Sequence, residues 1–552
     1  MLVDEYQDTN YAQHRIVWQL TRQHQHVCVV GDDAQSIYSF RGANIDNILT
    51  FQKIYDGSKL FKLERNYRST QNIVEAANSL IKKNSHQIQK DIFSENDRGE
   101  KLHVLDTHSD IEEAKMVVNA IRSIKRREGC EYSDFAILYR TNAQSRVFED
   151  TMRKEALPYR IYGGLSFYQR KEIKDVIAYF RMAVNPNDEE AFKRVINYPS
   201  RGIGQTTVAK ILETATHHEV SLWSVINSPE QYGLGVNKGT LTKIEKFREM
   251  IVSFIEQART LPANQIGTMI VKQSGIIADI YQDSTPENLS RQENVEELIN
   301  GMQDFCDMRM EEGNENISLN DYLSEVSLMS DVDSDKSDDG HKVTLMTIHS
   351  AKGLEFGTVF VVGLEEGLFP SDMVSGNPRE MEEERRPFYV AITRAKTHCY
   401  LSYAQCRFRY GQMEFSAPSR FLKDIDPKYL DRQQSMFSSR RSIDDDVQLP
   451  WARRERPTIN PHLSRVPSAS RLSSASGISS APTVSNRPAP SSLASQSSSS
   501  LAVGKHIIHN RFGRGEVLRI EGSGDNTKAT VQFENVGTKQ LLLKFAKFEV
   551  ID

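Results

Sequence analysis

The sequence has few of the features that mark secreted, membrane-spanning or polycationic proteins. Its 5 cysteines are scattered through 552 residues without a CxxC pair, so neither a disulfide framework nor a zinc site is indicated. It contains no apolar run of about 18 residues and no basic-then-apolar leader, which argues against a membrane span and against secretion. Lys+Arg 69 against Asp+Glu 74 leaves a net charge of −5, which excludes a polybasic coat but allows a local basic groove for nucleic acid. A reduced, cytosolic compartment is expected.

The first part of the sequence has the rhythm of an α/β domain. Residues 1–185 alternate short apolar runs with amphipathic helical patterns, and the runs Val27–Val30 and Phe135–Tyr139 predict buried strands. Residues 186–338 are predicted to be mostly helical. Strands are predicted again at Lys342–Thr347 and nearby, so the helical zone is interpreted as an insertion into an α/β domain that resumes after it.

The last part of the sequence changes composition twice. Residues 429–500 are rich in Ser, Pro, Arg and Ala, and such a segment cannot bury enough apolar area to offset its ordering entropy. We expect a disordered linker there. Residues 501–552 return to short alternating apolar patterns with glycine turns, which predict a small all-β barrel.

Two carboxylates follow the short apolar stretch that opens the sequence. In nucleotide hydrolases, an Asp at the end of a strand holds Mg²⁺, usually through water, and a neighbouring Glu activates the attacking water. Asp4 and Glu5 fit these two roles, although the pair alone also fits the start of a solvated loop.

A polar loop after the strand predicted at Val27–Val30 combines two kinds of chemistry. Gln35 could sense a γ-phosphate, whereas Tyr38, Phe40 and Arg41 could stack on and grip single-stranded DNA. One loop with both functions would couple hydrolysis to movement. Aromatic pairs more often fill a core, but the neighbouring polar and charged residues favour exposure here.

Taken in order, these segments resemble the motifs of the UvrD/Rep/PcrA-type superfamily 1 helicases. Segments similar to motifs II, III, IV, V and VI of that family are residues 3–10, 31–43, 63–69, 343–356 and 385–396. The resemblance covers nearly the whole chain apart from the linker. It implies an ATP-dependent helicase or translocase that moves 3′ to 5′ on single-stranded DNA in repair or replication, with ATP and Mg²⁺ as cofactors.

The resemblance also implies an α/β fold of RecA-like P-loop NTPase domains with a helical insertion and a Tudor-like barrel. The expected domains are a partial domain 1A over 1–85, a near-complete domain 2A over 86–185 and 339–428, an inserted helical domain 2B over 186–338, the disordered linker over 429–500 and the barrel over 501–552.

Site residues are carried over from the motifs by position. The implied catalytic residues are Asp4, Glu5, Gln35, Arg68 and Arg394, with Asp4 holding Mg²⁺ through water; Gln35, Arg68, Glu355 and Arg394 would bind the nucleotide. A guanidinium forks onto phosphate oxygens, which suits Arg394 as an arginine finger. Glu355 would accept hydrogen bonds from the ribose. A surface salt bridge is the alternative for either arginine.

The implied DNA path draws on several loops. Its residues are Tyr38, Phe40, Arg41, Thr141, Asn142, Thr347, His349, Gly202 and Gly204. Free N–H groups in the loop that holds Thr141 could bind phosphates, and the Gly202-x-Gly204 turn before a Thr-capped helix could grip duplex backbone at a junction of single and double strands. Phe40 stands where relatives commonly have Trp. His349 also fits a satisfied loop histidine, and the glycines also fit a plain turn.

The P-loop pattern GxxxxGK[ST] occurs nowhere in the 552 residues. In the resembled family it precedes motif II, and Met1 would fall within a buried Walker B strand. The sequence is therefore interpreted as an incomplete chain, a fragment expected to be inactive alone.

Two functions other than that of a helicase fit the sequence to different degrees. A non-catalytic adaptor that binds DNA and RNA polymerase is the alternative, whereas a helicase–nuclease fusion is disfavoured because no carboxylate-rich segment with a catalytic lysine stands out. Residues 501–552 would bind RNA polymerase or repair proteins, or would act as a folded spacer. The expected location is the bacterial cytoplasm, in association with the nucleoid.

Overall fold

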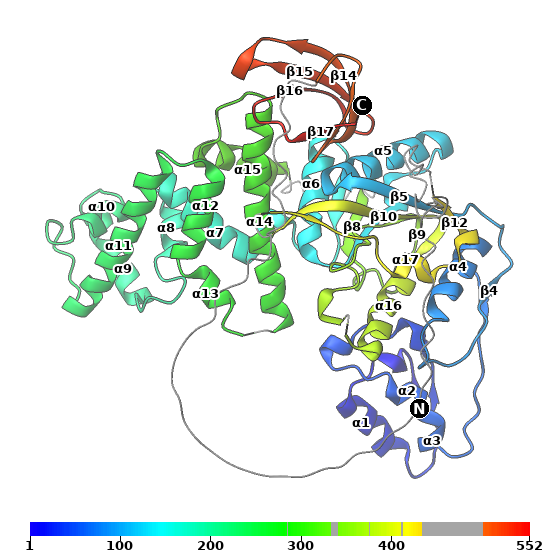
Figure 1. Ribbon diagram of the computed structural model, residues 1–552. Helices are drawn as coiled ribbons and strands as arrows, with labels where there is room; N and C mark the ends of the chain where they lie inside the picture. The colour runs from blue at the N-terminus through cyan, green and yellow to red at the C-terminus, as the bar shows by residue number, and fades with distance from the viewer. Residues whose placement is uncertain (284, 333–340, 375, 410–411, 433–500, 552) are drawn as a thin grey trace, which may run out of the picture. The chain divides into compact units, whose positions relative to one another are not determined.

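The computed structural model describes residues 1–283, 285–332, 341–374, 376–409, 412–432 and 501–551. These residues belong to one compact unit, whereas residues 434–497, most of the expected linker, lie outside the described ranges. Within those ranges, no helix has the length and apolar character needed to cross a membrane. The fold class expected from the sequence is confirmed: the chain is mixed α/β with a large, mainly parallel sheet (Figure 1).

A small sheet with three helices forms the start of the chain. Its elements are β1 (Leu2–Val3), α1 (Tyr11–Thr21), β2 (Cys28–Val29), α2 (Asp46–Leu49) and α3 (Phe51–Ile54), with β1 and β2 parallel. The strand predicted at Val27–Val30 forms, but the prediction that it is buried is wrong, because Val30 is 52% exposed. Leu2 of β1 is 85% exposed, so the buried strand expected around Met1 is not found either. In the described sheet these two strands pair with each other alone, and this leaves their side chains uncovered.

The large sheet is the centre of the α/β fold. Its order is β12-β5-β10-β9-β6-β8-β7, with β11 antiparallel beside β10, and its strands are β5 (Leu102–Ser109), β6 (Phe135–Tyr139), β7 (Tyr159–Ile161), β8 (Val343–Thr347), β9 (Phe356–Val361), β10 (Ala395–Arg409), β11 (Gln412–Phe415) and β12 (Leu430–Arg432). The buried strand predicted at Phe135–Tyr139 is confirmed as β6, and the strand predicted at Lys342–Thr347 is β8.

Helices cover both faces of the large sheet, as a parallel sheet requires (Figure 1). One face packs against α4 (Gln71–Ile81), α16 (Pro378–Ile392) and α17 (Phe421–Asp424), and the other against α5 (Asp110–Glu128) and α6 (Ser145–Lys154). A second short parallel pair, β3 (Arg65–Asn66) and β4 (Phe93–Ser94), flanks α4 in the sequence.

The expected domain limits differ from the packing in three places. Helix α4 lies within residues 1–85, yet its Ile73 and Leu80 pack with the large sheet's core because its apolar stripe faces that sheet. Helix α7 (Lys171–Val184) begins before residue 186, yet its core side chains pack among the inserted helices. Strand β12 falls in the segment predicted as linker from residue 429, because Leu430 pairs with Leu102 of β5.

The inserted helices share one hydrophobic core. They are α7, α8 (Glu189–Val195), α9 (Gln205–His217), α10 (Leu222–Asn227), α11 (Lys238–Ala258), α12 (Ala263–Gln273), α13 (Ile276–Ile280), α14 (Pro286–Glu311) and α15 (Leu319–Val332). Buried Phe180, Phe192, Phe247 and Phe254 lie in this core. We call residues 167–332 the helical region.

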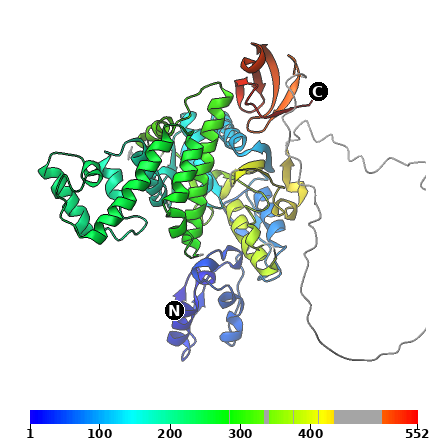
Figure 2. The same cartoon turned by 60° about the vertical axis from the view of Figure 1, so that its left-hand side comes forward.

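The C-terminal β domain, residues 501–551, is an antiparallel sheet (Figure 2). It has five strands in the order β16-β15-β14-β13-β17. Its strands are β13 (His506–His509), β14 (Gly513–Glu521), β15 (Lys528–Phe533), β16 (Gly537–Leu542) and β17 (Phe548–Val550). Val517, Val531 and Phe533 are fully buried in its own core. The all-β structure predicted from alternation is confirmed.

Candidate nucleotide and DNA site

The candidate catalytic carboxylates lie at the end of β1. Asp4 and Glu5 follow this strand directly, and the loop with Gln35 follows the parallel strand β2, so both reach the same edge of the sheet. Glu5 has a left-handed backbone, with φ 50°, and its N–H donates to Asp4 Oδ1 at 2.8 Å. Both side chains are exposed and therefore accessible to a hydrated metal ion.

Lys352, which follows β8, ties this edge to the large-sheet domain. Its Nζ lies 3.1 Å from Glu5 Oε2, pairs with Asp8 and donates to the carbonyl oxygen of Gln35 at 2.9 Å. Sequence reasoning gave this lysine no role. The available signal was that Lys352 is the one basic side chain, histidine apart, in residues 343–356.

Arg68 and Glu355 form an ion pair. Arg68 Nε donates to Glu355 Oε2 at 2.7 Å, and its Nη1 donates to the carbonyl oxygen of Thr393 at 3.1 Å. Lys396 Nζ lies 2.9 Å from the other oxygen of Glu355. Hydrogen bonds from Lys396 and Arg68 lower the pKa of Glu355 to about 2, so the carboxylate is ionised and available as an acceptor.

Arg394 is a buried cation whose hydrogen bonds go to neutral acceptors. Its side chain contacts the carbonyl oxygens of Val390 and Leu354, the Thr393 hydroxyl, and Gln35 Oε1 at 3.4 Å. Burial, followed by the nearby Arg68, lowers the pKa of Arg394 to about 10, which still leaves it charged near pH 7. A buried charge without a hydrogen-bonded anion is costly, so this position fits a phosphate group.

Gln35 is held in place by an ion-paired loop. Its Nε2 donates to Asp32 Oδ2 at 2.7 Å, and Lys90 pairs with Asp32 and lies 2.8 Å from Asp33 Oδ1. These contacts fix the side chain that faces Arg394. The structure therefore brings Asp4, Glu5, Gln35, Arg68, Glu355 and Arg394 into one connected set of contacts.

Three rings from two loops form the candidate DNA platform. Phe40 and His349 lie edge to face with centroids 5.1 Å apart, and Tyr38 lies 6.2 Å from Phe40 and 6.3 Å from His349. The Tyr38 hydroxyl donates to the His349 carbonyl oxygen at 3.2 Å. Phe40 is 50% exposed, with the Arg41 guanidinium 5.4 Å from its ring, whereas Tyr38 is half-buried, so the predicted exposure is confirmed for Phe40 and not for the whole loop.

His349 is neutral in this platform. Burial, together with the charges of Arg140 and Arg41, lowers the pKa of His349 to about 3. An uncharged imidazole can stack or hydrogen-bond but attracts no phosphate by charge. His349 can therefore be a packed loop histidine and still lie beside bound DNA.

The phosphate-binding loop expected after β6 is partly closed. Gln144 Oε1 accepts hydrogen bonds from the backbone N–H groups of Arg140 at 3.0 Å and Thr141 at 2.9 Å. The prediction that these backbone N–H groups are free is therefore wrong. Asn142 is exposed, while Thr347 Oγ1 accepts the N–H of Ser350 at 3.3 Å. The side chains of Thr141 and Asn142 remain the available groups of this loop.

Gly202 and Gly204 lie in the helical region, before α9. Gly204 itself is the N-cap of α9, so the expected threonine cap is wrong. Gly202 has φ 68°, which favours glycine, and Asn197 Oδ1 accepts the N–H groups of Arg201 and Ile203 at 3.0 Å each. The turn is thus ordered, with Lys243 Nζ 3.4 Å from the Gly202 carbonyl oxygen.

Family profiles match nearly all of the described chain. Residues 1–56 match the UvrD/REP helicase N-terminal domain, residues 61–406 the UvrD-like helicase C-terminal domain, and residues 503–549 the PcrA/UvrD tudor domain.

Curated relatives align over almost the full sequence. The chain is 36% identical over 551 residues to the ATP-dependent DNA helicase PcrA of Leuconostoc citreum, covering 100% of this chain and 71% of that protein. It is 38% identical over 554 residues to the protein of that name from Staphylococcus aureus strain Mu50, covering 99% of this chain and 70% of that protein. The chain therefore belongs to the UvrD-like helicase family, whose PcrA members are ATP-dependent DNA helicases.

Proposed function

We propose that this chain supplies the DNA-tracking and part of the ATP-hydrolysing machinery of a translocase that moves 3′ to 5′ on single-stranded DNA. The observation that carries the proposal is the loop of residues 31–43. Its Gln35 contacts Arg394, while its Tyr38 and Phe40 lie against His349. A displacement of this loop on nucleotide binding or hydrolysis would therefore move the ring platform directly.

The nucleotide roles follow from the charges at the site. Asp4 would hold Mg²⁺ through water, in keeping with its exposure and with the few protein ligands that Mg²⁺ needs. Within the described residues, no three His, Cys, Asp or Glu side chains form a dedicated metal cage. Bound Mg²⁺ would neutralise phosphate charge. Glu5 would orient the attacking water, and Arg68 and Arg394 would stabilise charge on the γ-phosphate.

We further propose that a polypeptide of these 552 residues alone does not turn over ATP. Arg68, Arg394 and Glu5 act on a triphosphate that a P-loop holds, and GxxxxGK[ST] is not among these residues. The second candidate is a non-catalytic adaptor that binds DNA and RNA polymerase, although Asp4, Glu5, Arg68 and Arg394 are all present as hydrolysis requires. In either case the C-terminal β domain would recruit RNA polymerase or a repair protein in the bacterial cytoplasm, at the nucleoid.

The helicase and the adaptor differ in whether adding a P-loop would restore ATP hydrolysis. A chain extended at its start with the P-loop-bearing segment of a PcrA relative should hydrolyse ATP when single-stranded DNA is added. Glu5→Gln in that chain should abolish turnover but leave DNA binding intact. An extended chain that binds DNA and ATP without hydrolysis would favour the adaptor.

A further inference from the structure

The C-terminal β domain contacts α14 of the helical region through Arg511. Arg511 lies in the turn between β13 and β14, and its Nη2 is 2.6 Å from Asp307 Oδ2 and 3.4 Å from Asp304 Oδ1. Its Nη1 also donates to the carbonyl oxygen of Asp304 at 3.0 Å. The side chain is 6% exposed, so this is a closed contact that water does not separate.

Two more basic side chains of the β domain face the same helix. His509 is fully buried, and its Nε2 lies 3.5 Å from Glu311 Oε1; its Nδ1 accepts the Arg511 N–H, which leaves the proton on Nε2. Lys539 Nζ lies 3.8 Å from Glu312 Oε1. Asp304, Asp307 and Glu311 are spaced three and four residues apart, so they form one acidic stripe on α14.

The turn that carries Arg511 also contacts α5 of the large-sheet domain. Ser109 Oγ, at the N-cap of α5, donates to the Arg511 carbonyl oxygen at 2.5 Å, and Asn535 Nδ2 donates to Glu112 Oε1 at 2.7 Å. A Cβ on Gly513, which has φ 69°, would come within 2.8 Å of the Glu112 carboxylate. One turn of the β domain therefore touches both the sheet domain and the helical region.

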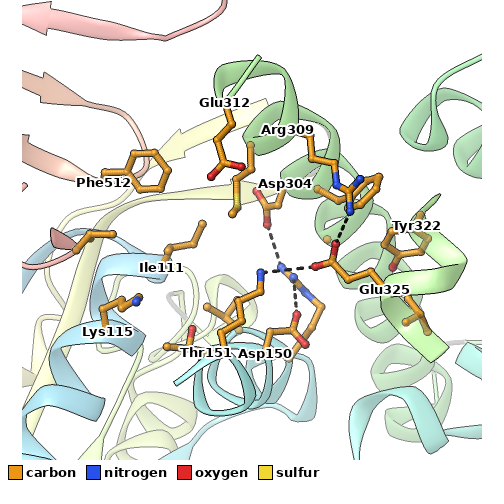
Figure 3. A pocket seen from close by; sticks show the side chains of 18 of the residues that line it. Ile111, Lys115, Asp150, Thr151, Asp304, Arg309, Glu312, Tyr322, Glu325 and Phe512 are labelled. Atoms are coloured by element: carbon orange, nitrogen blue, oxygen red, sulfur yellow. Dashed lines mark hydrogen bonds and ion pairs between the residues drawn. The ribbon is translucent and has the colours of Figure 1, made fainter. Parts of the chain in front are cut away.

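The contact is not packed throughout. A cavity of about 420 Å³ lies between these parts (Figure 3), with Phe512 of the β domain, Ile111 of α5, Asp150 of α6 and Tyr322 of α15 in its wall. The ion pairs that join the β domain to α14 lie beside this cavity, with Lys539 near Glu312 and Arg511 near Asp304 and Asp307. The more exposed Lys539–Glu312 pair should weaken with salt, whereas the buried Arg511 pairs are screened less and can instead exchange for other charged partners.

We propose that the C-terminal β domain is a releasable clasp in cis. Docked on the acidic stripe of α14 and on α5, it joins the helical region to the sheet domain, and its face with His509, Arg511 and Lys539 is closed to other proteins. Because the β domain and α14 belong to one chain, docking is intramolecular, so a modest ionic interface can hold the β domain in place. This inference extends the proposed role of the β domain in binding a partner protein. Only the peptide experiment below depends on that proposed role.

Cross-linking tests the clasp without reference to ATP or DNA. In a full chain with Cys28→Ser and Cys130→Ser, the pair Glu312→Cys and Lys539→Cys should be joined efficiently by a short bismaleimide. Arg511→Glu should lower the joined fraction at least fivefold. Arg519→Glu, at an arginine whose side chain is 72% exposed and pairs with Glu521, should leave it unchanged.

Exchanging the charges of Arg511 and Asp307 distinguishes undocking of the β domain from its unfolding. Arg511→Asp with Asp307→Arg should recover at least half of the joined fraction, which a misfolded β domain would not do. Equal cross-linking in Arg511→Glu and the parent, or equal loss in Arg519→Glu, would overturn the clasp.

A peptide with the sequence of the end of α14 tests whether α14 occupies the β-domain face that carries His509, Arg511 and Lys539. A labelled peptide of residues 300–316 with Cys306→Ser should bind the full chain at least tenfold more tightly when the chain carries Asp307→Ala and Glu312→Ala. A peptide without its two aspartates should not bind. If the peptide bound the parent chain equally tightly, the β-domain face with His509, Arg511 and Lys539 would be accessible, and the proposal would be contradicted. That result would not affect the ATPase experiment, which tests the proposed function separately.

Discussion

Lys352 Nζ lies 3.1 Å from Glu5 Oε2, and the same ammonium lies 5.4 Å from the centre of the Tyr38 ring. One cation thus contacts both the carboxylate proposed to activate water and a ring of the proposed DNA platform. This arrangement gives the account its first prediction.

Lys352→Ala should lower the free energy of unfolding by about 1–3 kcal/mol, the usual worth of a hydrogen bond to a charged group. Lys352 is 8% exposed, and its removal leaves Asp8 and Glu5 without their shared cation. Burial already raises the pKa of Asp8 while Lys352 lowers it, so the pKa of Asp8 should rise further in the variant. Urea unfolding measures the effect. Lys83→Ala, at an exposed lysine, is the control, and equal stability of the two variants would count against the contact.

Phe40→Ala should weaken single-stranded DNA binding by about 1–3 kcal/mol, the range measured for loss of one stacking ring. The log of the binding constant should also fall with the log of the salt concentration, because each neutralised phosphate releases counterions. Fluorescence anisotropy with an oligonucleotide gives both quantities. Phe61→Ala removes a phenylalanine that is 80% exposed outside the platform and should leave affinity unchanged. Equal affinity of Phe40→Ala and the parent would remove Phe40 from the DNA path.

His349 should make stability depend on pH. Its pKa is about 3 in the folded chain and near 6.5 when unfolded, so the unfolded state takes up a proton first as the pH falls. The stability is fully present above pH 6.5 and is lost as the pH falls from 6.5 towards 3. Between pH 8 and 5.5, His349→Gln should lose about 1 kcal/mol less than the parent in urea unfolding. Identical losses in the two chains would contradict the low pKa.

Local patterns predicted much of the fold, since β6 is a continuous apolar run, β8 is a mainly apolar one, and both form buried strands between covering helices. The motifs also named the residues that meet around Gln35 and Arg394. What the sequence did not show are contacts made by distant partners. The apolar stripe of α4 does not say which sheet it will meet, and the Gln144 side chain takes amides that looked free. Lys352 lacked a predicted role because its carboxylate partners lie more than 300 residues away in the chain.

The 552-residue polypeptide by itself should show no DNA-stimulated ATPase, because half of the preorganised phosphate donors are not among its residues. A steady-state phosphate-release assay with and without single-stranded DNA checks this. Strong hydrolysis that Glu5→Gln abolishes would reveal a phosphate cradle other than the P-loop.

The most direct measurement is DNA-stimulated turnover of the P-loop-extended chain with and without Arg394. If Arg394 stabilises the transferring phosphoryl group, Arg394→Ala should lower turnover by about 10³-fold or more while nucleotide-free DNA binding is unchanged. Arg379→Ala, which removes an exposed arginine paired with Asp46, should leave turnover near that of the parent. Near-normal turnover by Arg394→Ala would contradict the assignment of this buried arginine to the nucleotide.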